Sequence, residues 1–343
     1  MTRLLPTLLS VLAFAAVLPS SAGAQRLEVV RLERGRAVTG ASQLRVGDRL
    51  TLGVRVRALG QRGLRALPSD ASVRWMAVRP EMQHRHTPPP NEGIAQYSNA
   101  VLFGPNHGRW LGLDRIEYFE EPLADGAEFR WTAEQAGSRW FAAEATLSDG
   151  TVLRTPGASS TDRLGLDRRV FRVSVRSSDD FLGWLSTYFG VPNIFGSIGP
   201  QVDRYVGADC ADVLVGALRA YGHRPGYASV SGIGSVANPR GDVYRLTADG
   251  EVVNEAGIPV ELEWNVDVSP GDFLAIDYVT ASGLPRSWDH IGALLGDADG
   301  DGALSPEDGL RHMSPQGLVD QPLRRQGPIR IRVFQLRNRY RVQ

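Results

Sequence analysis

The sequence contains no lysine, a single cysteine and, after its N-terminus, no long apolar run. All 38 basic residues are arginines, and they balance 38 acidic residues to a formal net charge of zero. Because nucleic-acid-binding proteins usually carry a basic excess, we expect no nucleic-acid partner. The lack of a second long apolar run predicts no transmembrane segment in the mature chain. The lone cysteine, Cys210, rules out an internal disulfide.

The N-terminus has the organisation of a secretory signal peptide. Arg3 precedes an apolar stretch over residues 4–18, and residues 22–24 (Ala-Gly-Ala) resemble a cleavage site. A membrane anchor is the alternative, but the apolar stretch is short for a span and polar residues begin at Gln25. We therefore expect residues 1–24 to be removed and the mature protein to be periplasmic or extracellular.

Residues 25–176 have the pattern of a β-sandwich, because short alternating segments are separated by Gly, Pro, Asp and Asn turns. The candidate strands cover residues 27–32, 50–57, 72–78, 128–132, 139–147 and 170–175. Segments 46–52, 73–75 and 136–138 resemble bacterial immunoglobulin-like modules. Residues 80–125 fit this pattern poorly, and we expect them to be rich in loops.

Three histidines of this half, His84, His86 and His107, are candidates for a metal site or for surface positions. His84 and His86 could share one face of a strand. No cluster of carboxylates or cysteines accompanies them, which favours surface histidines. The first half is therefore expected to bind or position a partner without chemistry of its own.

The second half, residues 177–343, begins with helical spacing. Asp179 is placed to cap a helix with apolar positions between residues 181 and 189, and Gly190 is a natural stop. Strand patterns follow over residues 262–268, 271–278, 291–295 and 329–336. Helices that precede a mainly antiparallel sheet favour an α+β domain.

Cys210 is expected at the first position of a second helix. Asp209 is a good N-cap, apolar residues follow at helical spacing, and Gly222 can end the helix. The unpaired N–H groups and the helix dipole favour a thiolate there, whereas the neighbouring Asp212 acts in the opposite direction. The thiol is either a small buried apolar group or a nucleophile.

A cysteine nucleophile needs a histidine that accepts its proton and a third group that orients this histidine. His223 follows the cysteine helix directly, so about three helical turns separate it from Cys210. That separation is too long for proton transfer. His290 opens a predicted strand, and His312 follows the next loop, so both are candidates.

Four segments, in this order, resemble motifs of NlpC-type cell-wall peptidases, a branch of the papain-like cysteine peptidases. They are residues 191–196 (Val-Pro-Asn-Ile-Phe-Gly), 209–215 (Asp-Cys-Ala-Asp-Val-Leu-Val), 269–274 (Ser-Pro-Gly-Asp-Phe-Leu) and 290–297 (His-Ile-Gly-Ala-Leu-Leu-Gly-Asp). The resemblance covers residues 179–314. It implies a papain-like α+β fold with an antiparallel sheet, Cys210 as nucleophile, His290 as general base and acid, and His312 as the orienting residue.

The implied reaction is amide hydrolysis through a thioester acyl-enzyme, typically in peptidoglycan stem peptides, with the backbone N–H of Cys210 at the oxyanion. The chain departs from the family pattern in three places. Ala211 and Asp212 replace Ser-Gly, Asn193 stands where a tyrosine is common, and residues 226–260 lengthen the separation between cysteine and histidine. The alternative is a catalytically inactive, calcium-stabilised envelope protein of the same fold that binds peptide or glycan.

Residues 297–308 (Asp-Ala-Asp-Gly-Asp-Gly-Ala-Leu-Ser-Pro-Glu-Asp) fit a twelve-residue Ca²⁺ loop, with Gly302 at the sharp turn. The expected ligands are Asp297, Asp299, Asp301, the carbonyl of Ala303, Ser305 and Asp308. Aspartate at the last position, instead of glutamate, predicts modest affinity. The loop lies between His290 and His312, so a bound ion would fix the geometry of these two residues. We therefore expect the Ca²⁺ to be structural. An acidic glycine-rich turn without an ion is the alternative.

Overall fold

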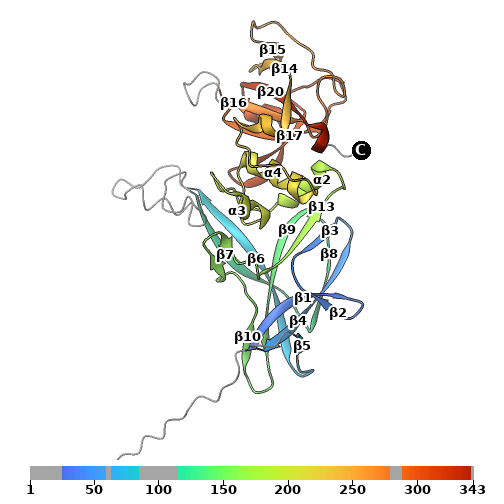
Figure 1. Ribbon diagram of the computed structural model, residues 1–343, viewed down its shortest axis with the longest axis vertical. Coiled ribbons are helices and arrows are strands. Elements are labelled where there is room, and N and C mark those ends of the chain that lie inside the picture. Colours follow the sequence, from blue (N-terminus) through green and yellow to red (C-terminus); the bar gives the residue numbers. More distant parts are fainter. Residues whose placement is uncertain (1–24, 59–62, 85–113, 279–287, 341–343) are drawn as a thin grey trace, which may run out of the picture.

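The computed structural model describes residues 25–58, 63–84, 114–278 and 288–340 (Figure 1). The expected signal peptide, residues 1–24, lies outside the described residues, as do His86 and His107. The described chain is mostly β-sheet with few helices, in the mixed α+β class expected from the sequence. In Figure 1 the sheets of the first half lie at one end, the helices lie in the middle, and a further sheet lies at the other end.

Two sheets face each other in the first half. Their strands are β1 (Gln25–Glu33), β2 (Arg36–Val38), β3 (Ser42–Arg45), β4 (Arg49–Ala58), β5 (Arg65–Ala66), β6 (Ser72–His84), β7 (Asp114–Asp125), β8 (Glu128–Thr132), β9 (Gly137–Thr146), β10 (Val152–Arg154) and β13 (Phe171–Arg176). One sheet has the order β2-β1-β4-β5, with β8 also on β4. The other has the order β3-β13-β9-β6-β7, with β10 also on β9. The short β11 (Thr161–Asp162) and β12 (Gly165–Leu166) pair with each other.

Strand β9 is buried on both of its faces. Successive side chains of a strand point to opposite sides. Phe141 and Ala143 accordingly pack between the two sheets, whereas Trp140 and Ala142 pack in a second cluster that also contains the helices of the second half. The apolar core therefore continues across residue 177, where the sequence predicts a domain boundary. That boundary stays a prediction.

The predicted strands of this half are confirmed, and β8 has the predicted bounds. Residues 80–125 contain more strand than expected, because β6 continues to His84 and pairs with β7 over its whole length. The ribbon of β6 and β7 projects beyond the rest of its sheet (Figure 1). Part of this ribbon has no buried face, so its sequence there does not alternate between apolar and polar residues as a half-buried strand does.

The second half contains α2 (Phe181–Leu185), η2 (Ser186–Tyr188), α3 (Gly199–Asp203), α4 (Cys210–Ala220), η3 (Ile233–Ser235), β14 (Ala237–Leu246), β15 (Val252–Asn254), β16 (Phe273–Asp277), β17 (His290–Gly296), β18 (Gly309–Ser314), β19 (Gly317–Pro322), η4 (Leu323–Gln326), β20 (Ile329–Leu336) and η5 (Asn338–Tyr340). The strand order is β15-β14-β20-β16-β17-β18-β19. Every neighbouring pair is antiparallel. Helix α4 packs against β17 and β18.

Two expectations for this half are wrong. Asp180, not Asp179, caps α2, because its Oδ1 accepts a hydrogen bond from the N–H of Gly183 at 2.7 Å. Asp179 instead pairs with Arg45 and Arg176. Residues 262–268 form isolated bridges and no strand, since their partners lie in the acidic loop and within the segment itself.

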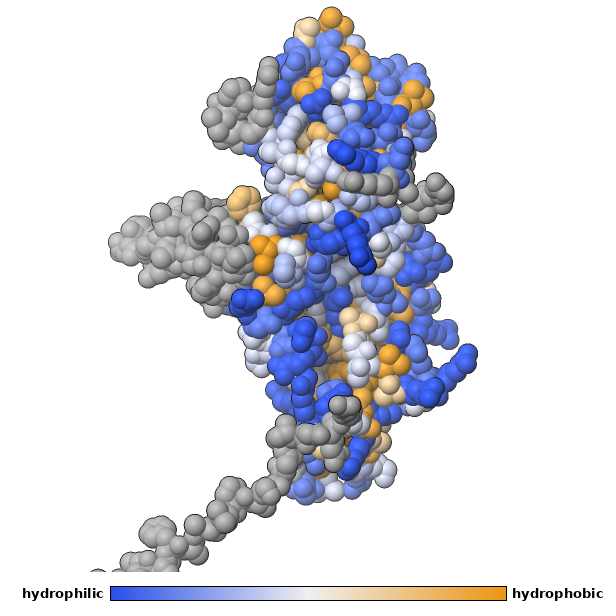
Figure 2. All heavy atoms as spheres, in the orientation of Figure 1, coloured by the Kyte–Doolittle hydropathy of each residue, from blue (hydrophilic) through white to orange (hydrophobic). Residues whose placement is uncertain are grey.

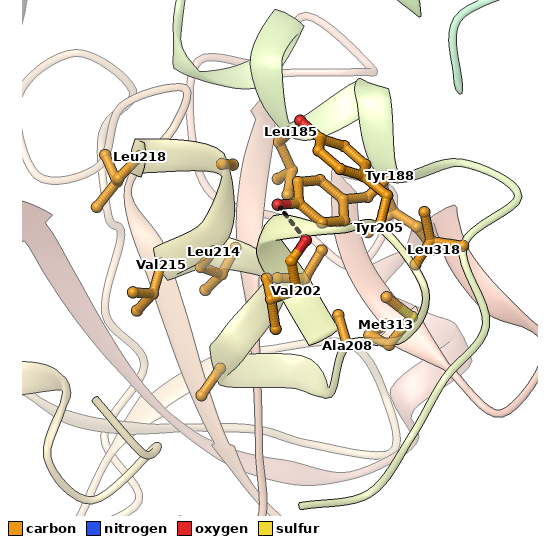
Figure 3. Packing of buried hydrophobic residues seen from close by; sticks show 14 of the residues in the cluster. Leu185, Tyr188, Val202, Tyr205, Ala208, Leu214, Val215, Leu218, Met313 and Leu318 are labelled. Atoms are coloured by element: carbon orange, nitrogen blue, oxygen red, sulfur yellow. Dashed lines mark hydrogen bonds between the residues drawn. The ribbon is translucent and has the colours of Figure 1, made fainter. Parts of the chain in front are cut away.

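Close packing of aromatic rings joins η2 to the segment before α4 (Figure 3). The rings of Tyr188 and Tyr205 stack with centroids 4.3 Å apart, and Tyr188 Oη donates to the carbonyl of Val202 at 3.3 Å. Gly216 permits this approach, because a Cβ there would lie 2.5 Å from Tyr188 Oη and 2.3 Å from Val202. The middle of α4 thereby packs closely against η2 and α3.

Hydrophilic residues cover most of the described surface on the face shown in Figure 2, with hydrophobic residues interspersed among them. Of the helices in the described part of the chain, none has the length and apolar character needed to cross a membrane.

Candidate active site and acidic loop

Cys210 occupies the predicted position at the start of α4. Its N-cap Asp209 accepts hydrogen bonds from the backbone N–H groups of Ala211 at 3.1 Å and Asp212 at 2.8 Å. Cys210 is partly exposed and packs against the core cluster that contains α4 and β17. The local sequence thus places the thiol at the helix N-terminus, as expected.

The surroundings of this thiol favour its neutral form. Burial raises the pKa of Cys210 to about 12, the Asp209 carboxylate raises it further, and the backbone N–H of Ile291 acts in the opposite direction. The side chain that caps the helix supplies a negative charge and also occupies two of the N–H groups that would favour a thiolate. Cys210 is therefore a neutral thiol in this arrangement.

Asp212 lies beneath the helix start and is only 2% exposed. Its Oδ2 accepts a hydrogen bond from Ser197 Oγ at 2.6 Å, and Ser197 Oγ accepts one from the N–H of Asp209 at 3.0 Å. Burial, followed by the Asp209 carboxylate, raises the pKa of Asp212 to about 7. The carboxylate that acts on the thiol is consequently Asp209, and not Asp212 as the sequence suggested.

The structure brings His290 and His312 together from adjacent strands. His290 Nε2 lies 2.8 Å from His312 Nδ1, and the two rings meet edge to face with centroids 4.9 Å apart. Burial, followed by the proximity of His312, lowers the pKa of His290 to about 3. Burial also lowers the pKa of His312. Both rings are therefore neutral near pH 7.

Three polar side chains that the sequence did not single out complete this group. Gln326 Nε2 lies 3.1 Å from His312 Nε2, and Gln321 Oε1 lies 3.4 Å from the same nitrogen. Tyr278 Oη donates to Gln326 Oε1 at 2.6 Å, and the Tyr278 ring stacks on His290 with centroids 6.2 Å apart. They come from the end of β16, from β19 and from η4, so no spacing in the sequence relates them.

The remaining candidate residues lie elsewhere. His223 packs edge-on against Tyr221 and Tyr340, just beyond the end of α4 opposite Cys210, as its sequence position indicated. Asn193 donates through Nδ2 to the carbonyl of Ser314 at 3.0 Å. That contact ties the loop before α4 to the end of β18.

In the acidic loop, carboxylate oxygens of Asp297, Asp299 and Asp308 lie within 4.8 Å of one another. Asp301 is not part of this group and instead accepts a hydrogen bond from the N–H of Ala303 at 2.8 Å. Gly302, at the predicted sharp turn, has a φ of 85°, which only glycine adopts readily. The turn geometry is as expected.

Asp308, at the last loop position, is fully buried. It accepts hydrogen bonds from the N–H groups of Ala298 at 2.7 Å and Ser305 at 2.8 Å, and from Trp264 Nε1 at 3.0 Å. Asp297 and Asp299 are exposed, and Ser305 Oγ donates to Asp299 at 2.9 Å. Carboxylate oxygens suit a hard cation such as Ca²⁺. Asp297, however, already accepts hydrogen bonds from the N–H groups of Gly300 and Gly302, and Asp308 accepts from three N–H groups.

A cavity of about 480 Å³ lies between the two sheets of the first half and reaches Gly190 at the junction with the second half. Its walls include the side chains of Arg79, Trp131, Arg139 and Phe141. Cys210, His290 and His312 do not line it. The cavity is therefore separate from the cysteine and histidine group.

No protein-family model matches this chain, and neither the curated proteins nor the solved structures contain a match. The function must consequently be inferred from the residues themselves.

Proposed function

We propose that this chain is an exported cysteine hydrolase of the NlpC type that cleaves amide bonds in peptidoglycan stem peptides. The observation that carries the proposal is the 2.8 Å contact between His290 Nε2 and His312 Nδ1. It lies on the strands against which the helix that begins at Cys210 packs. A nucleophile, a base and an orienting group are what this chemistry requires.

In this proposal Cys210 attacks the amide carbonyl carbon while its proton passes to His290. His290 then protonates the departing amine, which leaves a thioester on Cys210. Water attacks the thioester with His290 as base, which releases the carboxylic acid and restores the thiol. The backbone N–H of Cys210 would help to hold the oxyanion. The N–H groups of Ala211 and Asp212 already donate to the Asp209 side chain, so they would not serve this role.

Around this centre, residues 1–24 would direct export to the periplasm or the extracellular space, and residues 25–176 would form an immunoglobulin-like positioning module. Residues 177–343 would form the papain-like domain. Ca²⁺ at Asp297 and Asp299 would stabilise the connection between β17 and β18, which carry the two histidines. It would act on the structure and not on the reaction.

A second candidate is an inactive envelope protein of the same fold that binds peptide or glycan. The raised pKa of Cys210 and the lowered pKa of His290 favour it, because they describe a neutral thiol beside a neutral imidazole. In an active enzyme, substrate binding would have to change this balance.

The test is the release of amino groups from purified peptidoglycan with Ca²⁺ present. The wild type should release them, and Cys210→Ala and His290→Ala should not. His223→Ala is the matched control and should release them like the wild type, because His223 lies just beyond the end of α4 opposite Cys210. No release by the wild type, together with a thiol that alkylates only on unfolding, would favour the binding protein.

A further inference from the structure

A directed chain of hydrogen bonds determines which nitrogen carries the proton on each histidine. It begins at Tyr278, whose hydroxyl must donate to Gln326 Oε1, because an amide oxygen can only accept. At 2.6 Å this is a short contact. It orients the amide of Gln326 so that the NH₂ group faces His312 Nε2 at 3.1 Å.

An amide NH₂ can only donate, so His312 Nε2 must accept. The single proton of neutral His312 then lies on Nδ1, which donates to His290 Nε2 across 2.8 Å. Neutral His290 in turn carries its proton on Nδ1, the nitrogen that His312 leaves for other partners. The contact of 3.4 Å between Gln321 Oε1 and His312 Nε2 is long, as expected when two acceptors face each other.

This tautomer disagrees with the one that proton transfer from Cys210 needs. To accept the proton, His290 Nδ1 must be bare, with the imidazole proton on Nε2 and directed at His312 Nδ1. His312 must then carry its proton on Nε2, where Gln326 presents a donor and only Gln321 Oε1 can accept. Each imidazole carries one proton in both states, so the change from one tautomer to the other neither takes up nor releases a proton.

We infer that Tyr278, Gln326 and Gln321 are positioning residues that select between these two tautomers, an inference that rests on the proposed function. Tyr278 and Gln326 hold the resting state, and Gln321 receives the His312 proton in the state that can ionise Cys210. The titratable groups around the pair are Tyr278, with Cys210 and Asp289 beside it, and Asp320 beside His312. Of these, Tyr278 is the one bonded to Gln326.

The first measurement is the tautomer itself, by ¹⁵N imidazole chemical shifts of His290 and His312 in the full chain. In the wild type we expect both rings to be protonated at Nδ1. In Tyr278→Phe the amide of Gln326 is free to turn and to present Oε1, so both rings should shift toward the form protonated at Nε2. Wild-type spectra with His290 protonated at Nε2 would overturn the inference.

The second measurement is the pH profile of Cys210 alkylation by iodoacetamide. Tyr278→Phe and Gln326→Met should each move the profile down by about one pH unit, which is roughly a tenfold faster reaction at neutral pH. Gln321→Met should move it upward. Tyr227→Phe is the matched control, because Tyr227 also lies near Cys210 yet is 64% exposed, and it should leave the profile unchanged.

The two proposals fail in different ways. Unchanged alkylation in Tyr278→Phe and Gln326→Met would overturn the positioning roles even if peptidoglycan is cleaved. Shifted tautomers and alkylation without any cleavage by the wild type would leave the positioning roles in place and remove the hydrolase proposal. Gln326→Met keeps Tyr278, so a folding defect in one variant does not remove both tests.

Discussion

The acidic loop and the histidine pair occupy neighbouring stretches of the chain, yet they are built in opposite ways. The carboxylates of Asp297, Asp299 and Asp301 all accept from residues within the loop. The group around His290 and His312, by contrast, draws on β16, β17, β18, β19 and η4. Local hydrogen bonds can be inferred from spacing, whereas a site assembled from several strands depends on their register.

Asp308 is the exception within the loop, because Trp264 Nε1 reaches it from outside. Replacement of Asp308 by alanine would leave three N–H donors without their acceptor in a fully buried place. We expect a loss of roughly 3 to 6 kcal/mol in the free energy of unfolding, measured with urea. Asp301→Ala, in the exposed part of the loop, is the control and should cost far less. Equal losses would show that the loop is anchored throughout.

The buried carboxyl of Asp212 predicts that the free energy of unfolding depends on pH. Its pKa rises from 3.8 in the unfolded chain to about 7 in the fold. Between these values the folded state binds more protons, so this group's contribution to stability is complete below about pH 4 and is lost as the pH rises through about 7. The change is at most about 4 kcal/mol.

Urea unfolding at pH 4.5 and at pH 7.5 measures this effect. Asp212→Asn should flatten the difference between the two pH values, because asparagine cannot take up the proton. Asp149→Asn removes an exposed carboxylate with a lowered pKa and serves as the control. If Asp212→Asn keeps the wild-type slope, Asp212 is ionised in the fold.

The smallest expected effect concerns Ca²⁺ at the exposed side of the loop. Addition of Ca²⁺ should raise the Tm by a few degrees, since an ion that binds only the folded state stabilises it. Asp299→Asn should abolish this shift, whereas Asp301→Asn should retain most of it, because Asp301 lies outside the carboxylate group. Loss of hydrolysis on chelation without any change in Tm would contradict a structural ion.

The same contrast explains which elements could be predicted. The bounds of β8 and β20 match the alternation of their side chains, and α4 begins at Cys210 because Asp209 is a strong local cap. The sequence pattern did not predict β14, β15, β18 or β19. In β18 five of six residues are buried and in β19 only two of six are, so neither strand shows a clear alternation. In residues 262–268 the alternating apolar side chains predict a strand. Leu262, Trp264 and Val268 do pack in the core, but only isolated bridges form there.

For the site, the sequence indicates which residue types could react, but it does not indicate their protonation states. The sequence indicated Cys210, His290 and His312 as a site. The structure brings the two histidines to 2.8 Å, and their action with Cys210 stays a prediction. The sequence could not indicate that Asp209, not Asp212, raises the pKa of the thiol. Which of the two carboxylates acts on the thiol depends on the orientations of the Asp209 and Asp212 side chains in the fold.

By itself, the sequence determined the mixed α+β class, the start of the cysteine helix and the turn of the acidic loop. These features arise from side-chain alternation, caps and glycine conformations, which act over a few residues. Only the tertiary structure decided that Gln321 and Gln326 meet at His312 and that Tyr278 reaches Gln326 and His290. Their contacts join segments up to 48 residues apart, and strand register, not local preference, brings such groups within hydrogen-bonding distance.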